Sequence, residues 1–244
     1  MTTLAVERLS DRTIVRLDRP ETRNAINQEM VDELHAVCAE LEASPRILIV
    51  LGSNGVFASG ADIAELRERR AADAHRGINA GLFLRIAALP MPVIAAIDGY
   101  ALGGGAELAY AADFRIGTPM LKIGNPETGL GIIAAAGALW RLRELVGEPL
   151  AKEILLAGRI LGADDALAAR LVTEVHPTEE LEAAANALAD RIGVNDALAT
   201  QYTKAVFHAG DDEHPRADQD AQAVLFESPE KIRRMTEFLE RRRR

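Results

Sequence analysis

A run of small apolar residues that leads into a glycine triplet decides the fold of this chain: Val93-Ile94-Ala95-Ala96-Ile97-Asp98-Gly99-Tyr100-Ala101-Leu102-Gly103-Gly104-Gly105-Ala106-Glu107-Leu108. The unbroken apolar run over residues 93–97 is typical of a strand in a parallel sheet that is covered on both faces. The glycine triplet is expected to open a helix whose first N–H groups are not covered by any Cβ. The stretch therefore predicts a buried strand followed by a helix.

The flanking sequence repeats this alternation. Residues 47–51 form a second apolar run, and before it Asn27 can cap a helix with a buried stripe at Met30, Leu34, Val37 and Leu41. A loop over 52–60 is expected to lead to a helix from Asp62. Further predicted elements are a hairpin over 4–8 and 13–17, a helix over 72–88, short strands at 114–116 and 121–123, and helices over 134–146 and 149–157. This order indicates an α/β fold.

The last part of the sequence has a different character. Beyond Pro177 we expect only helices, near residues 178–192, 196–209, 215–226 and 229–242. With 244 residues, 48% of them hydrophobic, the chain can bury a substantial core. We therefore predict a core over residues 1–190 and a helical carboxyl-terminal region over 191–244.

Charge and composition argue against several classes of protein. The net charge of −9 disfavours a general nucleic-acid-binding or anionic-membrane surface. The apolar stretch over 91–112 is interrupted by Pro92, four glycines and two acidic residues, so we predict no membrane span. The amino terminus shows no secretory pattern, and we expect a cytoplasmic protein. Cys38 is the only cysteine and the five histidines are scattered, so no disulfide within the chain and no metal site are expected.

Two glutamates, Glu107 and Glu127, lie in apolar or glycine-rich surroundings. Burial disfavours the ionised form of a carboxylate, and a second carboxylate nearby raises one of the two pKa values further. Such a pair can hold a water molecule and transfer protons near neutral pH. The glutamates are therefore the first candidates for catalysis.

Two glycine-flanked turns each follow a predicted strand and open a helix, one at Gly103-Gly104 and the other over residues 57–63. Amides of Gly104 and Ala61 aimed at one thioester oxygen would stabilise an enolate, each by about 3 kcal/mol. The alternative is that both are tight turns that need glycine for backbone reasons alone.

Four ordered motifs together resemble the enoyl-CoA hydratase/isomerase, or crotonase, superfamily. They are Asp18-Arg19-Pro20-Glu21-Thr22-Arg23-Asn24-Ala25-Ile26-Asn27, Phe57-Ala58-Ser59-Gly60-Ala61-Asp62-Ile63, Ala96-Ile97-Asp98-Gly99-Tyr100-Ala101-Leu102-Gly103-Gly104-Gly105-Ala106-Glu107-Leu108 and Asn125-Pro126-Glu127-Thr128-Gly129-Leu130-Gly131. The resemblance implies a spiral of ββα turns with a helical carboxyl-terminal region for oligomerisation. It also implies a homo-oligomer, a trimer or a hexamer made of two trimers.

The resemblance further implies roles for individual residues. The amides of Ala61 and Gly104 would form the oxyanion hole, and the adjacent Gly103 would contribute to substrate binding. The acyl-CoA thioester would be bound by two segments, which comprise Arg23, Asn24 and Ala25 in the first and Ser59, Gly60, Asp62, Ile63 and Ala64 in the second.

This chain resembles the hydratases of the superfamily in that it carries both glutamates. In the implied mechanism Glu107 and Glu127 hold one water beside the double bond, Glu107 acts as base, and Glu127 manages the proton that reaches Cα. No cofactor is expected, because coenzyme A is part of the substrate. The alternatives are a double-bond isomerase, which Glu127 alone could serve, and an RNA-binding relative, which the acidic helix over 28–43 disfavours. A dinucleotide fingerprint at residues 129–134 is also disfavoured, because Pro126 and Glu127 replace the strand it needs.

Two segments depart from the pattern of the superfamily. After Gly131 relatives usually carry a proline and a glycine-rich turn, whereas this chain has Ile132-Ile133-Ala134-Ala135-Ala136-Gly137. The added methyl groups are expected to crowd the start of the next helix. The chain ends in arginines, Arg241 to Arg244, which either form a solvated helix end or reach the phosphates of CoA on a neighbouring subunit.

Overall fold

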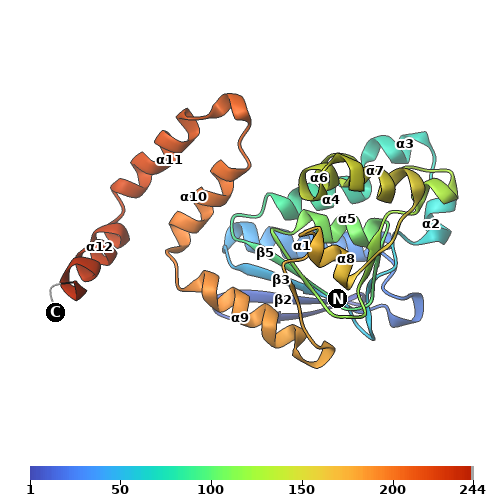
Figure 1. Ribbon diagram of the computed structural model, residues 1–244, viewed down its shortest axis with the longest axis horizontal. Coiled ribbons are helices and arrows are strands. Elements are labelled where there is room, and N and C mark those ends of the chain that lie inside the picture. The colour runs from blue at the N-terminus through green and yellow to red at the C-terminus, as the bar shows by residue number, and fades with distance from the viewer. Residues whose placement is uncertain (243–244) are drawn as a thin grey trace. The chain divides into compact units, whose positions relative to one another are not determined.

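The structure, a computed structural model, describes residues 1–242. It consists of two compact units, Met1–Ala189 and the residues from Asp190 onward (Figure 1). The first unit contains both β-sheets. No helix within the described residues is long and apolar enough to cross a membrane.

The larger sheet has six strands in the order β1-β2-β3-β5-β7-β10. Strands β1 and β2 form the predicted hairpin, and β2, β3, β5, β7 and β10 run parallel to one another. Every residue of β3 and β5 is buried, as their unbroken apolar runs predict for a covered parallel sheet. The strands are β1 Leu4–Arg8, β2 Arg12–Leu17, β3 Ile47–Leu51, β5 Val93–Ile97, β7 Phe114–Gly117 and β10 Glu174–Val175.

A second, four-stranded sheet has the order β4-β6-β8-β9. Its strands are β4 Val56–Ala58, β6 Tyr100–Leu102, β8 Lys122–Gly124 and β9 Leu161–Gly162. The prediction of a loop throughout residues 52–60 is wrong, because β4 lies inside it. Strands β4, β6, β9 and β10 were not predicted, because two or three residues carry little of an alternating pattern. The equally short β8 was expected at 121–123 and spans Lys122–Gly124.

The two sheets are built by a repeated turn of the chain. A strand of the larger sheet is followed by a strand of the smaller sheet and then by helix, as in β3-β4-α2 and β5-β6-α5. Strands β4, β6 and β8 run parallel, so successive turns stack on one another. This is the expected spiral of ββα turns. Its consequence is that the ends of β4, β6 and β8 meet at one edge of the smaller sheet.

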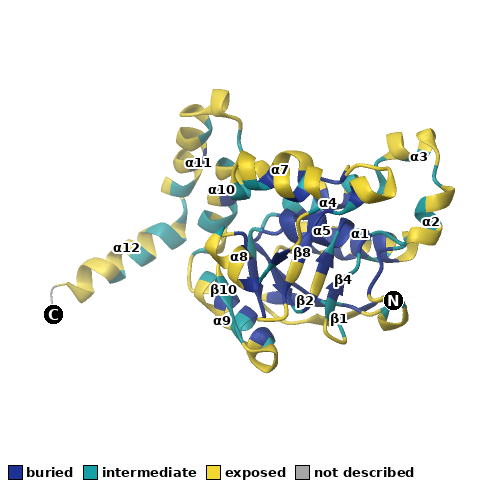
Figure 2. Cartoon of the chain, turned by 45° about the vertical axis from the view of Figure 1, so that its right-hand side comes forward, coloured by how far each residue is buried: buried dark blue, intermediate teal, exposed yellow. Residues whose placement is uncertain are grey.

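Helix α5 is buried along its whole length, whereas α2 and α3 contain no buried residue (Figure 2). Helix α1 begins as predicted, with Asn27 Oδ1 accepting a hydrogen bond of 3.0 Å from the Met30 N–H. A Cβ on Gly105 would lie 2.2 Å from the Ala58 carbonyl oxygen, so glycine permits the close packing of α5 on β4. Figure 1 shows α4 and α5 on one side of β2, β3 and β5.

Two predicted helices have other limits. The helix expected over 72–88 is divided into α3 and α4 at Gly77, whose φ of 60° is left-handed. The helix expected from Ala134 begins at Ala138. The α-helices of the first unit are α1 Gln28–Ala43, α2 Ile63–Glu68, α3 Ala71–Arg76, α4 Ile78–Ala87, α5 Gly104–Ala111, α6 Ala138–Val146, α7 Glu148–Ala157, α8 Ala163–Ala168 and α9 Leu181–Gly193, which runs into the second unit. Short 3-10 helices span Pro20–Thr22, Glu127–Leu130 and Thr178–Glu180.

The second unit is helical, as expected. It contains α10 Ala197–Phe207, α11 Arg216–Phe226 and α12 Pro229–Arg241, with a 3-10 helix at Asp211–Glu213. Arg233 and Arg234 near the start of α12 pair with Glu230 of the same helix, at 2.5 and 2.6 Å. The terminal arginine run that was singled out in the sequence lies partly outside the described residues, since Arg243 and Arg244 are not among them.

Candidate active site

Three of the four sequence motifs leave the ends of adjacent parallel strands. Ala58, Leu102 and Gly124 are the last residues of β4, β6 and β8, and Leu102 is paired with Gly124. The Gly103 N–H donates to the Gly124 carbonyl at 2.9 Å, which continues the pairing past the strand ends. The turns that follow the three strands therefore converge, although Ala58 and Leu102 are 44 positions apart and Leu102 and Gly124 are 22 apart. Such convergence is usual for sites at the carboxyl ends of parallel strands.

The amides of Ala61 and Gly104 lie next to each other. A Cβ built on Gly104 would be 3.2 Å from the Ala61 nitrogen, so only glycine leaves this space open. Ile26 pairs with the backbone on either side of Ala61. Its N–H donates to the Gly60 carbonyl at 2.8 Å, and its carbonyl accepts from the Asp62 N–H at 2.9 Å. These bonds leave the Ala61 N–H directed away from Ile26. Two amides side by side can stabilise an oxygen that gains negative charge.

The carboxylate of Glu127 lies beside Gly103, which precedes the Gly104 amide. The φ of 52° at Gly103 is left-handed, and a Cβ there would lie 3.1 Å from Glu127 Oε1. The conformation opens α5 directly at Gly104, so the positive end of the helix dipole faces the space beside Glu127. The glycine triplet thus serves separate purposes: Gly103 turns the chain and Gly105 lets α5 pack on β4.

Glu107 is held by backbone amides. It lies in the first turn of α5 and is 3% exposed, and its Oε1 accepts hydrogen bonds from the Ala136 and Ala138 N–H groups at 2.7 and 3.2 Å. Burial raises the pKa of Glu107 to about 7, partly opposed by these amides and further increased by the charge of Glu127. The alanine-rich turn before α6 therefore fixes the carboxylate, and near neutral pH this group can both give and take a proton.

Glu127 has one side-chain partner and one unpaired oxygen. Its Oε1 accepts from Asn125 Nδ2 at 3.3 Å, while Oε2 is buried and has no hydrogen-bond partner within the described residues. Burial raises the pKa of Glu127, against the effect of hydrogen bonds from its own backbone and from Asn125. A buried carboxylate oxygen without a partner is suited to a proton shared with a water molecule or a substrate.

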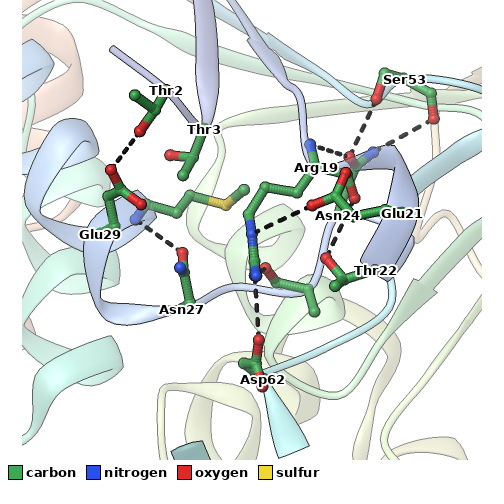
Figure 3. Close-up of polar contacts among 12 residues, drawn as sticks. Thr2, Thr3, Arg19, Glu21, Thr22, Asn24, Asn27, Glu29, Ser53 and Asp62 are labelled. Atoms are coloured by element: carbon green, nitrogen blue, oxygen red, sulfur yellow. Dashed lines mark hydrogen bonds and ion pairs between the residues drawn. The ribbon is translucent and has the colours of Figure 1, made fainter. Parts of the chain in front are cut away.

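The first motif supports the turn that carries Ala61. Asn24 is fully buried and uses its whole amide: Oδ1 accepts from the Arg19 N–H at 2.9 Å, and Nδ2 donates to the Val56 carbonyl at 2.7 Å. Arg19 donates to the Ala25 carbonyl at 2.6 Å and pairs with Asp62 at 3.2 Å (Figure 3). Asp62 also caps α2 by accepting from the Ala64 N–H. These side chains fasten two loops together.

The structure places the predicted site residues in two groups. Eight line a single cavity of about 600 Å³ in the first unit: Ser59, Gly60, Ala61, Ile63, Gly103, Gly104, Glu107 and Glu127. The other five are not in its lining, namely Arg23, Asn24, Ala25, Asp62 and Ala64. Arg23 is exposed, and its carbonyl accepts a hydrogen bond from the N–H of Ser59, which lines the cavity.

Four features of the site were not predicted from the sequence. Asn125 donates to Glu127, and two polar residues line the cavity, Arg69 directly after α2 and Asn79 in α4. The amides of Ala136 and Ala138 hold Glu107. A backbone N–H is present in almost every residue type, so the sequence does not indicate which ones bind Glu107. Without the fold, a polar helical residue that faces a cavity cannot be distinguished from one that faces solvent. The spacing Asn125-Pro126-Glu127 was the one signal that sequence reasoning could have used.

Comparison with known proteins agrees with this geometry. The profile of the enoyl-CoA hydratase/isomerase family matches residues 12–244. The chain is 34% identical to a crotonyl-CoA hydratase of Syntrophomonas wolfei over 98% of this chain and 96% of the relative. It is 33% identical to a short-chain-enoyl-CoA hydratase of Clostridium acetobutylicum, covering 94% and 92%. The crystal structure of an enoyl-CoA hydratase from Bacillus anthracis superimposes with a TM-score of 0.92 at 28% identity, covering 98% of this chain and 96% of that chain. This chain belongs to the enoyl-CoA hydratase/isomerase family.

Proposed function

We propose that this protein is an enoyl-CoA hydratase, which adds water across the 2,3 double bond of a trans-2-enoyl-CoA thioester. The observation that carries the proposal is the presence of two buried glutamates, Glu107 and Glu127, in the same cavity as the adjacent amides of Ala61 and Gly104. The curated relatives named above, which this chain matches over nearly its whole length, are themselves named as hydratases of enoyl-CoA substrates.

The N–H groups of Ala61 and Gly104 donate hydrogen bonds to the thioester oxygen. When water adds to Cβ, negative charge moves to this oxygen, and two fixed donors, one at the start of α5 and the other just before α2, stabilise the resulting enolate. Because the donors are set before the reaction, no reorganisation is needed as the charge develops. Ser59, Gly60 and Ile63 line the approach to this point.

The glutamates divide the proton transfers. Glu107 takes a proton from the attacking water, for which its pKa of about 7 is well matched near neutral pH. Glu127 supplies the proton that reaches Cα, since its buried Oε2 is unpaired and its pKa is raised by burial. Mutual repulsion favours a state in which the pair holds one proton.

The coenzyme A part of the substrate is bound along the loops that contain Arg23 to Ala25 and Ser59 to Ala64. The hydrogen bonds of Asn24 and Asp62 serve this role indirectly by holding the two loops at a fixed spacing. The proposed reaction uses no separate cofactor or metal, since every step is assigned to a carboxylate or to a backbone amide. The cytoplasm remains the proposed location.

The helical region from residue 191 serves oligomerisation, as a trimer or a dimer of trimers. Helix α12 supports this proposal, because it carries an exposed apolar stripe at Ile232, Met235, Phe238 and Leu239. Exposed apolar side chains at helical spacing mark a surface that another protein covers. Sedimentation analysis of the full chain tests this part of the proposal.

The reaction is tested by incubating the purified protein with crotonyl-CoA and, separately, with a 3-enoyl-CoA, followed by mass analysis of the products. A hydratase adds 18 Da, about the mass of one water, to crotonyl-CoA. Conversion of the 3-enoyl substrate to its 2-enoyl isomer, with crotonyl-CoA left unchanged, contradicts the proposal and assigns the protein as an isomerase. Glu107→Gln and Glu127→Gln variants serve as catalytic controls.

A further inference from the structure

The cavity contains a positively charged group that the hydration chemistry does not use. Arg69, at the end of α2, lines the same cavity as Glu107 and Glu127, together with Asn79 of α4. Most of the remaining wall on this side is apolar, formed by Leu66, Ala74, Ile78, Ala80, Leu130, Ile132 and Ile133. A guanidinium in such surroundings is unexpected for a pocket that binds a simple hydrocarbon chain, because burial removes part of the hydration of its charge.

Arg69 has only long contacts with acceptors inside the protein. Its side chain is 21% exposed, and the nearest carboxylate oxygen, Glu65 Oε2, is 4.0 Å away. Its NH1 donates to Asn79 Oδ1 at 3.4 Å, near the limit for a hydrogen bond. By contrast, the guanidinium of Arg85 binds both oxygens of Glu42 at 2.7 Å. Arg69 therefore retains most of its capacity to bind an anion.

The other charged residues of this wall are already engaged. Asp73 accepts from the Arg70 N–H at 2.9 Å and from Arg76 at 2.5 Å, so its charge is compensated. The Arg70 guanidinium donates to backbone carbonyls of its own turn, including that of Glu68 at 2.9 Å. Arg69 is thus the charged group on this wall whose donors remain underused within the described residues.

Asn79 connects Arg69 with the thioester end of the cavity. It is buried, and a Cβ on Gly104 would lie 3.6 Å from its Nδ2. Within the described residues this Nδ2 donates to no protein acceptor, while Oδ1 faces Arg69. The side-chain amide of Asn79 therefore lies between the Arg69 guanidinium and Gly104, one of the two proposed oxyanion donors. An acyl chain of only a few carbons spans such a distance.

We propose that Arg69, supported by Asn79, binds a carboxylate at the far end of a short acyl chain. The substrate class is then the CoA monothioester of an unsaturated dicarboxylic acid. This inference rests on the proposed hydration and specifies its substrate. The guanidinium offers a carboxylate two parallel N–H donors, and such charge-assisted bonds are the strong ones. A methyl-ended chain leaves the same partly buried guanidinium without a carboxylate partner, so the site discriminates against it.

The test compares substrates of equal length on the purified full chain. They are trans-2-hexenoyl-CoA, the six-carbon enoyl-CoA that ends in a carboxylate, and the same compound with the carboxylate converted to a neutral amide. We expect kcat/KM for the carboxylate to exceed that for either neutral substrate at least tenfold. This comparison needs no variant, so it stands even if a substitution impairs folding.

Two variants locate the origin of the preference. Arg69→Met removes the charge and keeps a long apolar side chain, and it should reduce the carboxylate-to-methyl ratio of kcat/KM at least tenfold. Arg67→Met is the matched control on α2, because the Arg67 side chain is 80% exposed, pairs with Glu68 and does not line the cavity. It should leave the ratio within twofold of the wild-type value.

The outcomes separate this inference from the proposed function. Hydration of hexenoyl-CoA with no preference for the carboxylate overturns the inference and leaves the hydratase proposal standing. A preference that Arg69→Met does not change also overturns it, because the carboxylate is then recognised elsewhere. Failure to hydrate any of the three substrates overturns both. Hydration of the carboxylate substrate alone supports both.

Discussion

The most informative perturbation is Glu107→Gln, because the same burial that tunes this residue for catalysis should destabilise the fold. Burial raises the pKa of Glu107 from 4.5 to about 7. Between these two values the folded protein holds a proton that the unfolded chain has lost. The free energy of unfolding therefore falls as pH rises through this window and is constant above it. The full loss is about 3 kcal/mol.

Glutamine is neutral at every pH and can still accept from the Ala136 and Ala138 amides, so the variant lacks this loss. Its stability relative to the wild type should therefore increase by about 2 kcal/mol between pH 5.5 and pH 8.5. For a chain of this size such a gain corresponds to about 4–8 °C in Tm. The difference between two pH values cancels any pH-independent effect of the substitution. At the same time hydratase activity should be lost.

The measurement is urea unfolding of both proteins at the two pH values, followed by circular dichroism and by the fluorescence of Trp140, the only tryptophan. Glu7→Gln, at an exposed position of β1, is the control for the removal of a surface carboxylate. If the stability difference for Glu107→Gln stays the same at both pH values, or shrinks as pH rises, the assignment of a raised pKa to Glu107 is wrong.

Three further predictions concern neighbouring residues. Gly104→Ala, which fills the space between the two amides, should reduce kcat about 10²–10³-fold, whereas Gly81→Ala, with nothing within 4 Å of the new methyl group, should leave kcat unchanged and slightly stabilise α4. Glu127→Gln should reduce kcat/KM about 10²–10⁴-fold and shift the acidic limb of the residual pH profile below the wild-type value near 7, since the charge of Glu127 raises the pKa of Glu107. Asn24→Gly, which preserves the positive φ of 56°, should lower the free energy of unfolding by about 2–3 kcal/mol and raise KM.

Each of these has a decisive readout. Steady-state kinetics with crotonyl-CoA would contradict the oxyanion assignment if Gly104→Ala retained wild-type kcat. For Glu127→Gln, an acidic limb at an unchanged pH would show that the two carboxylates do not interact. Chemical unfolding of Asn24→Gly without loss of stability would mean that its buried hydrogen bonds are replaced by others.

The sequence predicted the parts of the fold that have long patterns. The five-residue apolar runs identified β3 and β5 as buried parallel strands, and the Asn27 cap with its apolar stripe identified α1. The three-residue strands β4 and β6 were not predicted, because three residues are too few to establish a pattern. Yet these strands bring the predicted turns together. The ordered motifs therefore predicted the location of the site, which local periodicity did not.

The candidate site was predicted through residue types that are unusual in their surroundings. Glu107 and Glu127 stood out as carboxylates among apolar and glycine residues, and the structure places both in one cavity with Ala61 and Gly104. Their catalytic roles remain predictions. Arg69 could not be identified from the sequence, because whether an arginine at the end of a short helix faces solvent or a cavity depends on tertiary packing.

The support of Glu107 by peptide N–H groups has a consequence for how this enzyme can vary. Every amino acid except proline carries such a donor, so the turn before α6 can change its side chains without losing its hold on the carboxylate. Ala135 and Ala136 also line the cavity. Substitutions at these positions can therefore change the acyl-chain preference while the hydrogen bonds to Glu107 are kept. Substrate preference and acid–base catalysis can then vary independently.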